Sequence, residues 1–194
     1  MGLRERNATR TREHIVAAAI ALFVEQGYDA TTMEQIAARA EVGTSTLYRY
    51  FPTKERLAVA PLGPADLMAR TLAARPDDEQ VQRSLGAAIL ALVEGNEALD
   101  GAGRGMRDIL LSHDRPRAQA LEWLQEAQVS LIGALAERMG LPADDLRVTT
   151  TAWGAIFVLQ SLDDPRHAGR PQGEVARELM VALSSIDWTP PAVP

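Results

Sequence analysis

Residues 30–57 read ATTMEQIAARAEVGTSTLYRYFPTKERL, and the fold of the N-terminal part of the chain depends on this stretch. It predicts two short helices joined by a tight turn, with a third helix beginning just behind them. Thr32 and Gln35 have the spacing of a capping box at the start of the first helix. Thr31 with Glu34 is the alternative register. Apolar residues then recur at the spacing expected for an amphipathic helix.

A turn is predicted at residues 41–43, where Gly43 is expected to adopt backbone angles that are closed to other residues. The second helix is predicted over residues 44–50. Pro52 should stop this helix because proline cannot continue an interior helical hydrogen-bond ladder, and Thr53 can cap the helix that follows.

The second helix has hydroxyl and phenol groups instead of a regular amphipathic stripe. Leu47 and Phe51, four residues apart, are expected to anchor it inward. The other residues of the helix are left to face outward: Thr44, Ser45, Thr46, Tyr48, Arg49 and Tyr50. Such a face suits the second helix of a helix-turn-helix, which lies in the major groove of DNA. The alternative is a solvated helix of an ordinary helical protein.

Residues 11–57 resemble the N-terminal DNA-binding domain of the TetR family of transcriptional regulators. The residues that carry the resemblance are Ile15 to Phe23, Gly27-Tyr28, Thr31-Thr32-Met33, Ile36-Ala37, Val42-Gly43, Thr46-Leu47-Tyr48-Arg49-Tyr50-Phe51, Lys54-Glu55 and Leu57. Gly43 departs from the pattern, because the family more often has a serine cap there. Beyond Leu57 the resemblance is reduced to length and helical pattern.

The resemblance implies how the residues around this motif meet a double-stranded DNA operator. Thr44, Ser45 and Arg49 are expected at base edges, and Arg49 could bind guanine through two hydrogen bonds. The expected phosphate contacts are Thr32, Thr46, Tyr48, Tyr50 and Lys54, with Arg10 and Arg12 from the basic N-terminal segment. If Arg10, Arg12, Arg49 and Lys54 of two subunits each neutralise a phosphate, the logarithm of affinity should fall with the logarithm of salt concentration with a slope of about −7.

Composition fits a chain of this kind. The 194 residues have a net charge of −6, but residues 1–57 contain eight basic and seven acidic side chains, so the acidity lies outside the proposed DNA-binding part. Cysteine is absent, which excludes disulfides and thiolate chemistry. The polar N-terminus does not resemble a signal peptide, and no apolar run has the length of a membrane span. We expect a cytoplasmic protein without a membrane partner.

The sequence predicts an all-α fold of two domains, with a helix-turn-helix domain at residues 1–52 and a helical ligand-binding and dimerisation domain at residues 53–194. The first helix is expected over residues 9–26. Pro61, Gly63 and Pro64 interrupt the helix that should connect the domains, so a break is predicted at residues 60–64. This break is either a passive kink or a hinge in an allosteric connector.

The last two helices are predicted at residues 143–162 and 173–186. The first of them is apolar on two sides, so it must be buried on two sides. The resemblance implies that these two helices pair with their copies in a four-helix interface of a homodimer. Val175 and Leu179 are among the residues expected to face the partner.

The resemblance also implies a small-molecule effector that binds in the C-terminal domain and releases the protein, acting as a repressor, from a palindromic operator. The residues proposed for its pocket are Met106, Leu110, His113, Trp123, Gln128, Trp153 and Phe157. Gln128 is informative because an amide within an apolar stripe needs a polar partner. Few of these residues carry a charge, so the effector is expected to be uncharged and lipophilic.

Two other functions remain open at this point. The first is a small-molecule-processing enzyme, but the three histidines lie far apart and no metal-binding or nucleophile motif occurs, so we predict no catalytic residue, metal or cofactor. The second is a helical dimer that acts through a protein partner. A gel-shift experiment would separate these functions from DNA binding.

Overall fold

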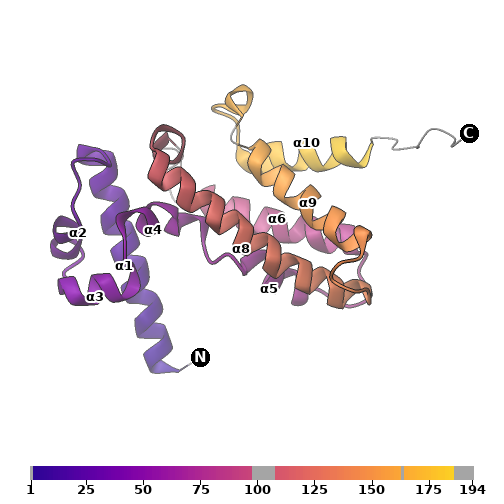
Figure 1. The fold of residues 1–194 in the computed structure, drawn as a ribbon, viewed down its shortest axis with the longest axis horizontal. Coiled ribbons are helices and arrows are strands. Elements are labelled where there is room, and N and C mark those ends of the chain that lie inside the picture. The colour runs from indigo at the N-terminus through magenta and orange to yellow at the C-terminus, as the bar shows by residue number, and fades with distance from the viewer. Residues whose placement is uncertain (1, 98–107, 163, 186–194) are drawn as a thin grey trace, which may run out of the picture. The chain divides into compact units, whose positions relative to one another are not determined.

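The computed structural model describes residues 2–97, 108–162 and 164–185 of the chain. Within these ranges every regular element is a helix (Figure 1), which confirms the predicted all-α class. Among the described residues, no helix combines the length and the apolar character needed to cross a membrane.

The contacts between residues divide the chain into two compact units. The first unit contains Met1–Ala65 and Asn96–Glu126, and the second contains Asp66–Gly95 and Ala127–Pro194. The domain boundary at residue 53 therefore stays a prediction, because each unit contains two separate segments of the chain.

The first unit contains the predicted helix-turn-helix (Figure 1). Its elements are α1 (Leu3–Gln26), α2 (Met33–Arg39), α3 (Thr44–Tyr50), α4 (Lys54–Val59) and the 3-10 helix η1 (Ala60–Leu62). Residues 108–112 are also helical, and the first half of α8 (Asp114–Met139) belongs to this unit. The positions of α2 and α3 agree with the prediction.

The core of the first unit is built from the apolar stripe of α1 and the inward sides of α2, α3 and α4. Ile15, Ile36, Leu47 and Leu57, one from each helix, have no exposed surface. Gly27 ends α1 with φ +87°, a conformation that glycine adopts without the clash that a β-carbon causes. The helices are therefore held by one shared apolar core.

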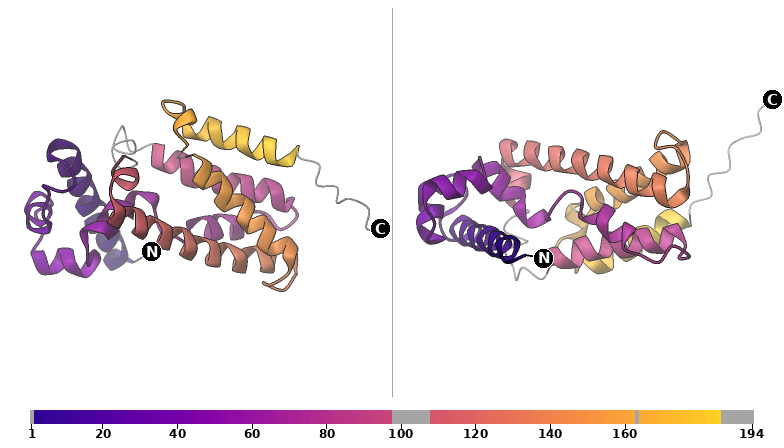
Figure 2. Two further views of the ribbon diagram at one scale, coloured as in Figure 1. Left: turned by 45° about the horizontal axis from the view of Figure 1, so that its top comes forward. Right: turned by 90° about the horizontal axis from the view of Figure 1, so that it is seen from below.

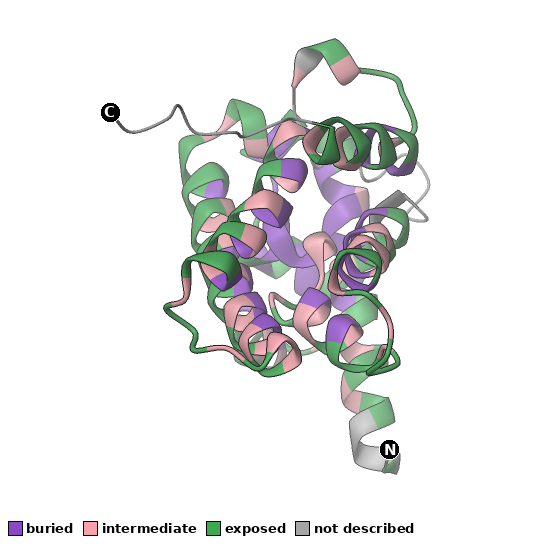
Figure 3. Ribbon diagram, turned by 90° about the vertical axis from the view of Figure 1, so that its right-hand side faces the viewer, coloured by how far each residue is buried: buried purple, intermediate pink, exposed green. Residues whose placement is uncertain are grey.

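The start of α1 differs from the prediction. The helix begins at Leu3, whereas the sequence predicted a start at residue 9. The basic N-terminal segment is therefore helical, and Arg10 within it is exposed. Figure 3 shows exposed and half-buried turns in this part of α1, near the N label. The first turns of α1 form helical backbone hydrogen bonds, although they have no apolar stripe. Hydrophobic periodicity therefore could not predict that the helix begins at Leu3.

The predicted break after α4 is confirmed. α4 tightens into η1, and Gly63 follows with φ +78°. The indole nitrogen of Trp123 donates a hydrogen bond of 2.8 Å to the Gly63 carbonyl oxygen. α5 begins at Leu67, after this break.

The second unit contains α5 (Leu67–Ala73), α6 (Val81–Glu97) up to Gly95, the second half of α8, α9 (Leu146–Ser161) and α10 (Gln172–Ser184). The 3-10 helix η2 (Pro165–His167) lies between α9 and α10. α10 packs against α9 and α6 (Figure 2), and Arg177 of α10 pairs with Glu94 of α6.

α9 has the two apolar sides that the sequence predicted. Val148, Ala152, Ala155 and Ile156 are buried in the unit. The opposite side is exposed, and it carries Leu146, Thr150, Trp153 and Phe157. On α10, Val175 is buried in its own unit, so the expectation that it faces a partner is wrong.

Candidate nucleic-acid interface

α2 begins with the capping box that the sequence predicted in its first register. The Gln35 backbone N–H donates to Thr32 Oγ1 at 3.3 Å, and the Thr32 backbone N–H donates to Gln35 Oε1 at 2.9 Å. Both bonds satisfy donors at the helix start that have no partner within the helix. Thr32 is exposed, and its hydroxyl oxygen is used as the cap.

The turn between α2 and α3 forms in a different way from the prediction. Gly43 has φ −66°, which any residue can adopt, and Glu41 instead has the left-handed φ of +52°. The Val42 N–H donates to the Ala37 carbonyl oxygen at 3.0 Å, which closes the end of α2. Val42 packs against the core of the first unit.

α3 presents its polar side to solvent because its apolar anchors are buried. Leu47 and Phe51 are 0% and 2% exposed. Thr44, Ser45 and Arg49 are exposed, and so is Tyr48. The other two predicted DNA contacts on this helix, Thr46 and Tyr50, are half-buried. The predicted inward side of α3 is confirmed, and Thr44, Ser45, Tyr48 and Arg49 face solvent as predicted. Tyr50 instead packs against the core of the first unit, because its ring covers apolar side chains there, so its predicted outward position is wrong.

The exposed side of α3 is ordered by contacts with its neighbours. The Tyr48 hydroxyl lies 3.4 Å from Glu34 Oε1 on α2. The Arg49 guanidinium lies 5.5 Å from the centroid of the Tyr50 ring. Glu34 was not predicted as part of this surface, because the spacing of α2 alone does not show that its first turn lies beside Tyr48.

The two predicted arginine contacts of α1 lie in different surroundings. Arg10 is exposed, whereas Arg12 is half-buried with its guanidinium 5.0 Å from the centroid of the Phe51 ring. Phe51 is the residue that ends α3. Arg12 therefore joins α1 to the end of the proposed recognition helix.

Lys54 has protein partners for its ammonium group. Nζ donates to the carbonyl oxygens of Tyr28 at 2.8 Å, Thr31 at 3.0 Å and Asp29 at 3.5 Å. It also lies 4.2 Å from the centroid of the Tyr28 ring. The role of Lys54 as a phosphate contact stays a prediction, and this geometry gives the residue a second possible role.

The residues proposed for an effector pocket lie in different parts of the chain. Leu110, His113 and Trp123 belong to the first unit, and Gln128, Trp153 and Phe157 belong to the second. Met106 lies outside the described residues.

His113 contacts the loop between α1 and α2. Its Nε2 lies 3.5 Å from Asp29 Oδ2, and its ring packs edge-on against Tyr28. Burial raises the pKa of the Tyr28 hydroxyl well above its usual value. His113 and Tyr28 together hold the chain around residue 113 against the helix-turn-helix.

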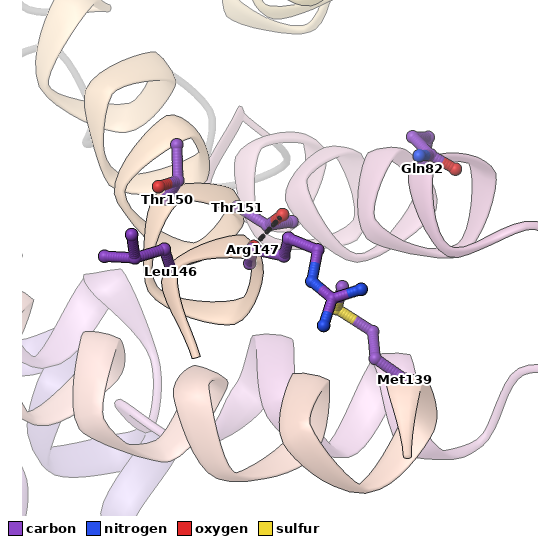
Figure 4. Close-up of a pocket in the computed structure, with 6 residues that line it drawn as sticks. All are labelled: Gln82, Met139, Leu146, Arg147, Thr150 and Thr151. Atoms are coloured by element: carbon purple, nitrogen blue, oxygen red, sulfur yellow. Dashed lines mark hydrogen bonds between the residues drawn. The ribbon is translucent and has the colours of Figure 1, made fainter. Parts of the chain in front are cut away.

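A surface hollow of about 470 Å³ opens in the second unit. Its lining residues are Gln82, Met139, Leu146, Arg147, Thr150 and Thr151 (Figure 4). Arg147 extends toward Met139 and is paired with Asp145 at 2.8 Å, which lowers the pKa of Asp145 to about 2. None of the predicted effector residues that the structure describes lines this hollow.

Comparison with known proteins extends the resemblance beyond the helix-turn-helix. Residues 15–60 match the family described as "Bacterial regulatory proteins, tetR family". The HTH-type transcriptional regulator TcmR of Streptomyces glaucescens is 33% identical over 151 residues, which cover 74% of this chain and 67% of TcmR. The HTH-type transcriptional repressor KstR of Mycobacterium tuberculosis is 46% identical over 52 residues, which cover 27% of this chain and 24% of KstR.

Solved structures share the fold over most of the chain. SmeT in its triclosan complex is 21% identical with a TM-score of 0.58, and the match covers 95% of this chain and 99% of SmeT. NalD, the secondary repressor of the MexAB-OprM multidrug efflux pump in Pseudomonas aeruginosa, is 22% identical with a TM-score of 0.58, covering 91% of this chain and 96% of NalD. TcmR and KstR are regulators of transcription. Because the match to TcmR covers about three quarters of this chain (74%), well beyond the helix-turn-helix, the chain belongs to the tetR family of bacterial transcriptional regulators.

Proposed function

We propose that the protein is a repressor that binds a palindromic operator as a homodimer and releases it when a small molecule binds to the C-terminal part. The observation that carries DNA binding is the orientation of α3. Burial of Leu47 and Phe51 leaves Thr44, Ser45 and Arg49 facing outward. Short hydroxyls and a guanidinium are groups that hydrogen-bond to base edges in the major groove.

Dimerisation is supported by the exposed side of α9. Leu146, Trp153 and Phe157 lie on one side of the helix and are 81%, 58% and 50% exposed, and Val181 of α10 is 69% exposed. Large apolar side chains grouped on one surface are typical of a protein–protein interface. A two-fold dimer through these helices would place two α3 helices about 34–36 Å apart, one turn of DNA.

The proposed effector is an uncharged, lipophilic molecule. Support comes from the chemistry of the second unit, where the half-buried amide of Gln128 lies next to buried Ala127 and near buried Leu131. An amide in such surroundings can orient a mostly apolar ligand through one or two hydrogen bonds. Displacement of DNA then requires that the effector bind the released conformation more tightly than the DNA-bound one.

Selection from random-sequence DNA duplexes tests the proposal. The full chain should enrich an inverted repeat whose half-sites are about 10 base pairs apart, and footprinting should show protection of both halves. Arg49→Met should then weaken binding by about 1–3 kcal/mol and relax the preference at one base pair in each half-site. Arg83→Met, on the exposed side of α6, is the control and should bind as the wild type does. Enrichment of no sequence would contradict the proposal.

A further inference from the structure

We propose that Lys54 is a positioning residue, whose ammonium group fixes the loop before α2 and thereby the orientation of α2 and α3, instead of neutralising a DNA phosphate. This inference rests on the proposed DNA-binding function. It concerns how the chain's only lysine contributes to that function.

The ammonium group uses all of its hydrogen-bonding capacity within the protein. A lysine ammonium has three N–H donors, and Nζ of Lys54 has three carbonyl acceptors in the loop at Tyr28, Asp29 and Thr31. The Tyr28 ring lies beneath the same group at 4.2 Å, which adds a cation–π interaction. A phosphate oxygen could be bound only after one of these acceptors is given up.

The carbonyls that Lys54 holds belong to a loop that side-chain hydrogen bonds also hold on its other side. Thr31 is 1% exposed, and its hydroxyl donates to the Gly27 carbonyl oxygen at 2.8 Å. Gln26 Nε2 donates to Thr31 Oγ1 at 3.2 Å and to Gln35 Oε1 at 2.9 Å. Gln35 in turn caps the start of α2. A continuous set of hydrogen bonds therefore runs from Lys54 to the first turn of α2.

The position of Lys54 explains why this set of bonds affects DNA recognition. Lys54 is the first residue of α4, which follows α3 after three residues, and the carbonyls that it binds precede α2. One side chain thus joins the chain before the helix-turn-helix to the chain behind it. Loss of these bonds would free the entry to α2 and allow α3 to turn, so that its base contacts weaken more than its phosphate contacts.

The inference changes the expected salt dependence of binding. Each neutralised phosphate contributes about −0.9 to the slope. Arg10, Arg12 and Arg49 of two subunits would together give about −5, whereas adding Lys54 would give about −7. Removal of the Lys54 charge should therefore leave the slope unchanged, whereas removal of a phosphate contact in both subunits should make it less steep by about 2.

The test compares Lys54→Met, Lys54→Arg and Arg10→Met in the full-length protein. Affinity is measured by fluorescence anisotropy at several salt concentrations, for a duplex selected by the wild-type protein and for a scrambled duplex of the same length. The active fraction of each variant is determined by stoichiometric titration. A change in stability alone alters that fraction, but it does not change the ratio of the two affinities. If the wild type selects no duplex, the proposed function itself fails.

We expect Lys54→Met to keep the wild-type slope and to lose about tenfold or more in preference for the selected duplex, as when one base contact is lost. Lys54→Arg should show the same loss, because a planar guanidinium cannot direct three donors at these three carbonyls. Arg10→Met should reduce the slope with little effect on preference. The inference is overturned if Lys54→Met reduces the slope and Lys54→Arg restores it, or if neither variant changes the preference. Should Lys54→Met fail to fold, Lys54→Arg decides: wild-type preference rejects the inference.

Nuclear magnetic resonance gives an independent measurement, since one lysine produces one side-chain signal. With lysine labelled by ¹⁵N, the Nζ signal should be visible in the free protein because its protons are held by three acceptors. It should stay unchanged when the selected duplex is added, while amide signals of α3 shift. A shift of the Nζ signal as large as those of α3 would show that the ammonium group meets the DNA, which would overturn the inference.

Discussion

Among the residues that the structure describes, Glu41 is the only non-glycine with a positive φ. Glu41 follows Ala40, the C-cap of α2, and its backbone lies in the left-handed region. In this conformation the β-carbon crowds the following carbonyl oxygen, which costs about 1–2 kcal/mol. The backbone conformation is set by the bond from the Val42 N–H to the Ala37 carbonyl, which closes the turn of the helix-turn-helix. The strain is therefore tolerated at the corner that orients α3.

Glu41→Gly should relieve this strain. Glycine loses about 0.5–1 kcal/mol of conformational entropy on folding, so a net stabilisation of about 0.5–1 kcal/mol is expected. Urea unfolding followed by circular dichroism measures the change. Glu41→Gln removes the charge alone and serves as the control. If glycine is no more stabilising than glutamine, the left-handed backbone is not a source of strain.

Glu79 is a second residue whose environment has a measurable consequence. Arg75 forms two hydrogen bonds to its carboxylate and Ser84 donates to Oε2 at 2.7 Å, and these bonds lower the pKa of Glu79 to about 2. The charged form is therefore favoured in the folded state relative to the unfolded state. The resulting stabilisation is complete above the ordinary glutamate value and is lost as pH falls from about 5 to 2.

Glu79→Gln should lower stability at pH 7 and weaken the dependence of stability on pH between 5 and 2. The free energy of unfolding in urea at a series of pH values measures this. Glu137→Gln, which removes an exposed carboxylate from the second unit, is the control and should leave the profile as in the wild type. An unchanged profile for Glu79→Gln would show that its partners do not favour the charged form.

At the scale of elements, the break after α4 is held by a contact with α8. Gly63 has a left-handed backbone, and its carbonyl oxygen accepts the hydrogen bond from the Trp123 indole. Loss of the indole donor would leave the carbonyl oxygen of half-buried Gly63 without this partner. The geometry of the break therefore depends on a specific partner as well as on Pro61 and Pro64.

A double-mutant cycle measures this dependence. Trp123→Phe should cost about 1–3 kcal/mol of stability. Gly63→Ala should cost about 1–3 kcal/mol because φ +78° with ψ −177° is a combination essentially confined to glycine. The double variant should cost less than the sum by at least 0.5 kcal/mol, since both changes disrupt the same bond. Additive effects in urea unfolding would mean that the bond does not hold the break.

At the scale of the whole molecule, the proposed dimerisation rests on the exposed apolar side of α9. Trp153 and Phe157 are half exposed or more, and they lie next to Leu146 and Thr150 on the same side of the helix. The opposite side of α9 is already buried in the second unit. A charge on the exposed side should therefore affect association and leave the fold intact.

Trp153→Asp with Phe157→Asp should halve the mass measured by analytical ultracentrifugation, with an unchanged circular dichroism spectrum. Binding to the selected palindromic duplex should fall by about 10²-fold or more, because the two half-sites are then bound independently. Val129→Asp on α8 places a charge at another exposed valine and should leave both measurements unchanged. A double variant that keeps the dimer mass would show that the interface lies elsewhere.

The sequence by itself determined the features that arise from residues close together in the chain. Thr32 and Gln35 marked the start of α2, Leu47 and Phe51 marked the inward side of α3, Pro61 and Gly63 marked the break, and the two sides of α9 followed from its periodicity. Caps, proline stops and helical periodicity act over a few residues, so they can be read from the order of the residues.

Only the tertiary structure decided the partners of Lys54, His113 and Trp123. Each of these side chains meets a group 23 or more residues away in the chain, and Trp123 meets one 60 residues away. It also decided that Glu41, and not Gly43, takes the left-handed backbone at the turn. These contacts depend on how several helices pack around one core. No local pattern specifies that packing, because helices with the same pattern can meet different neighbours.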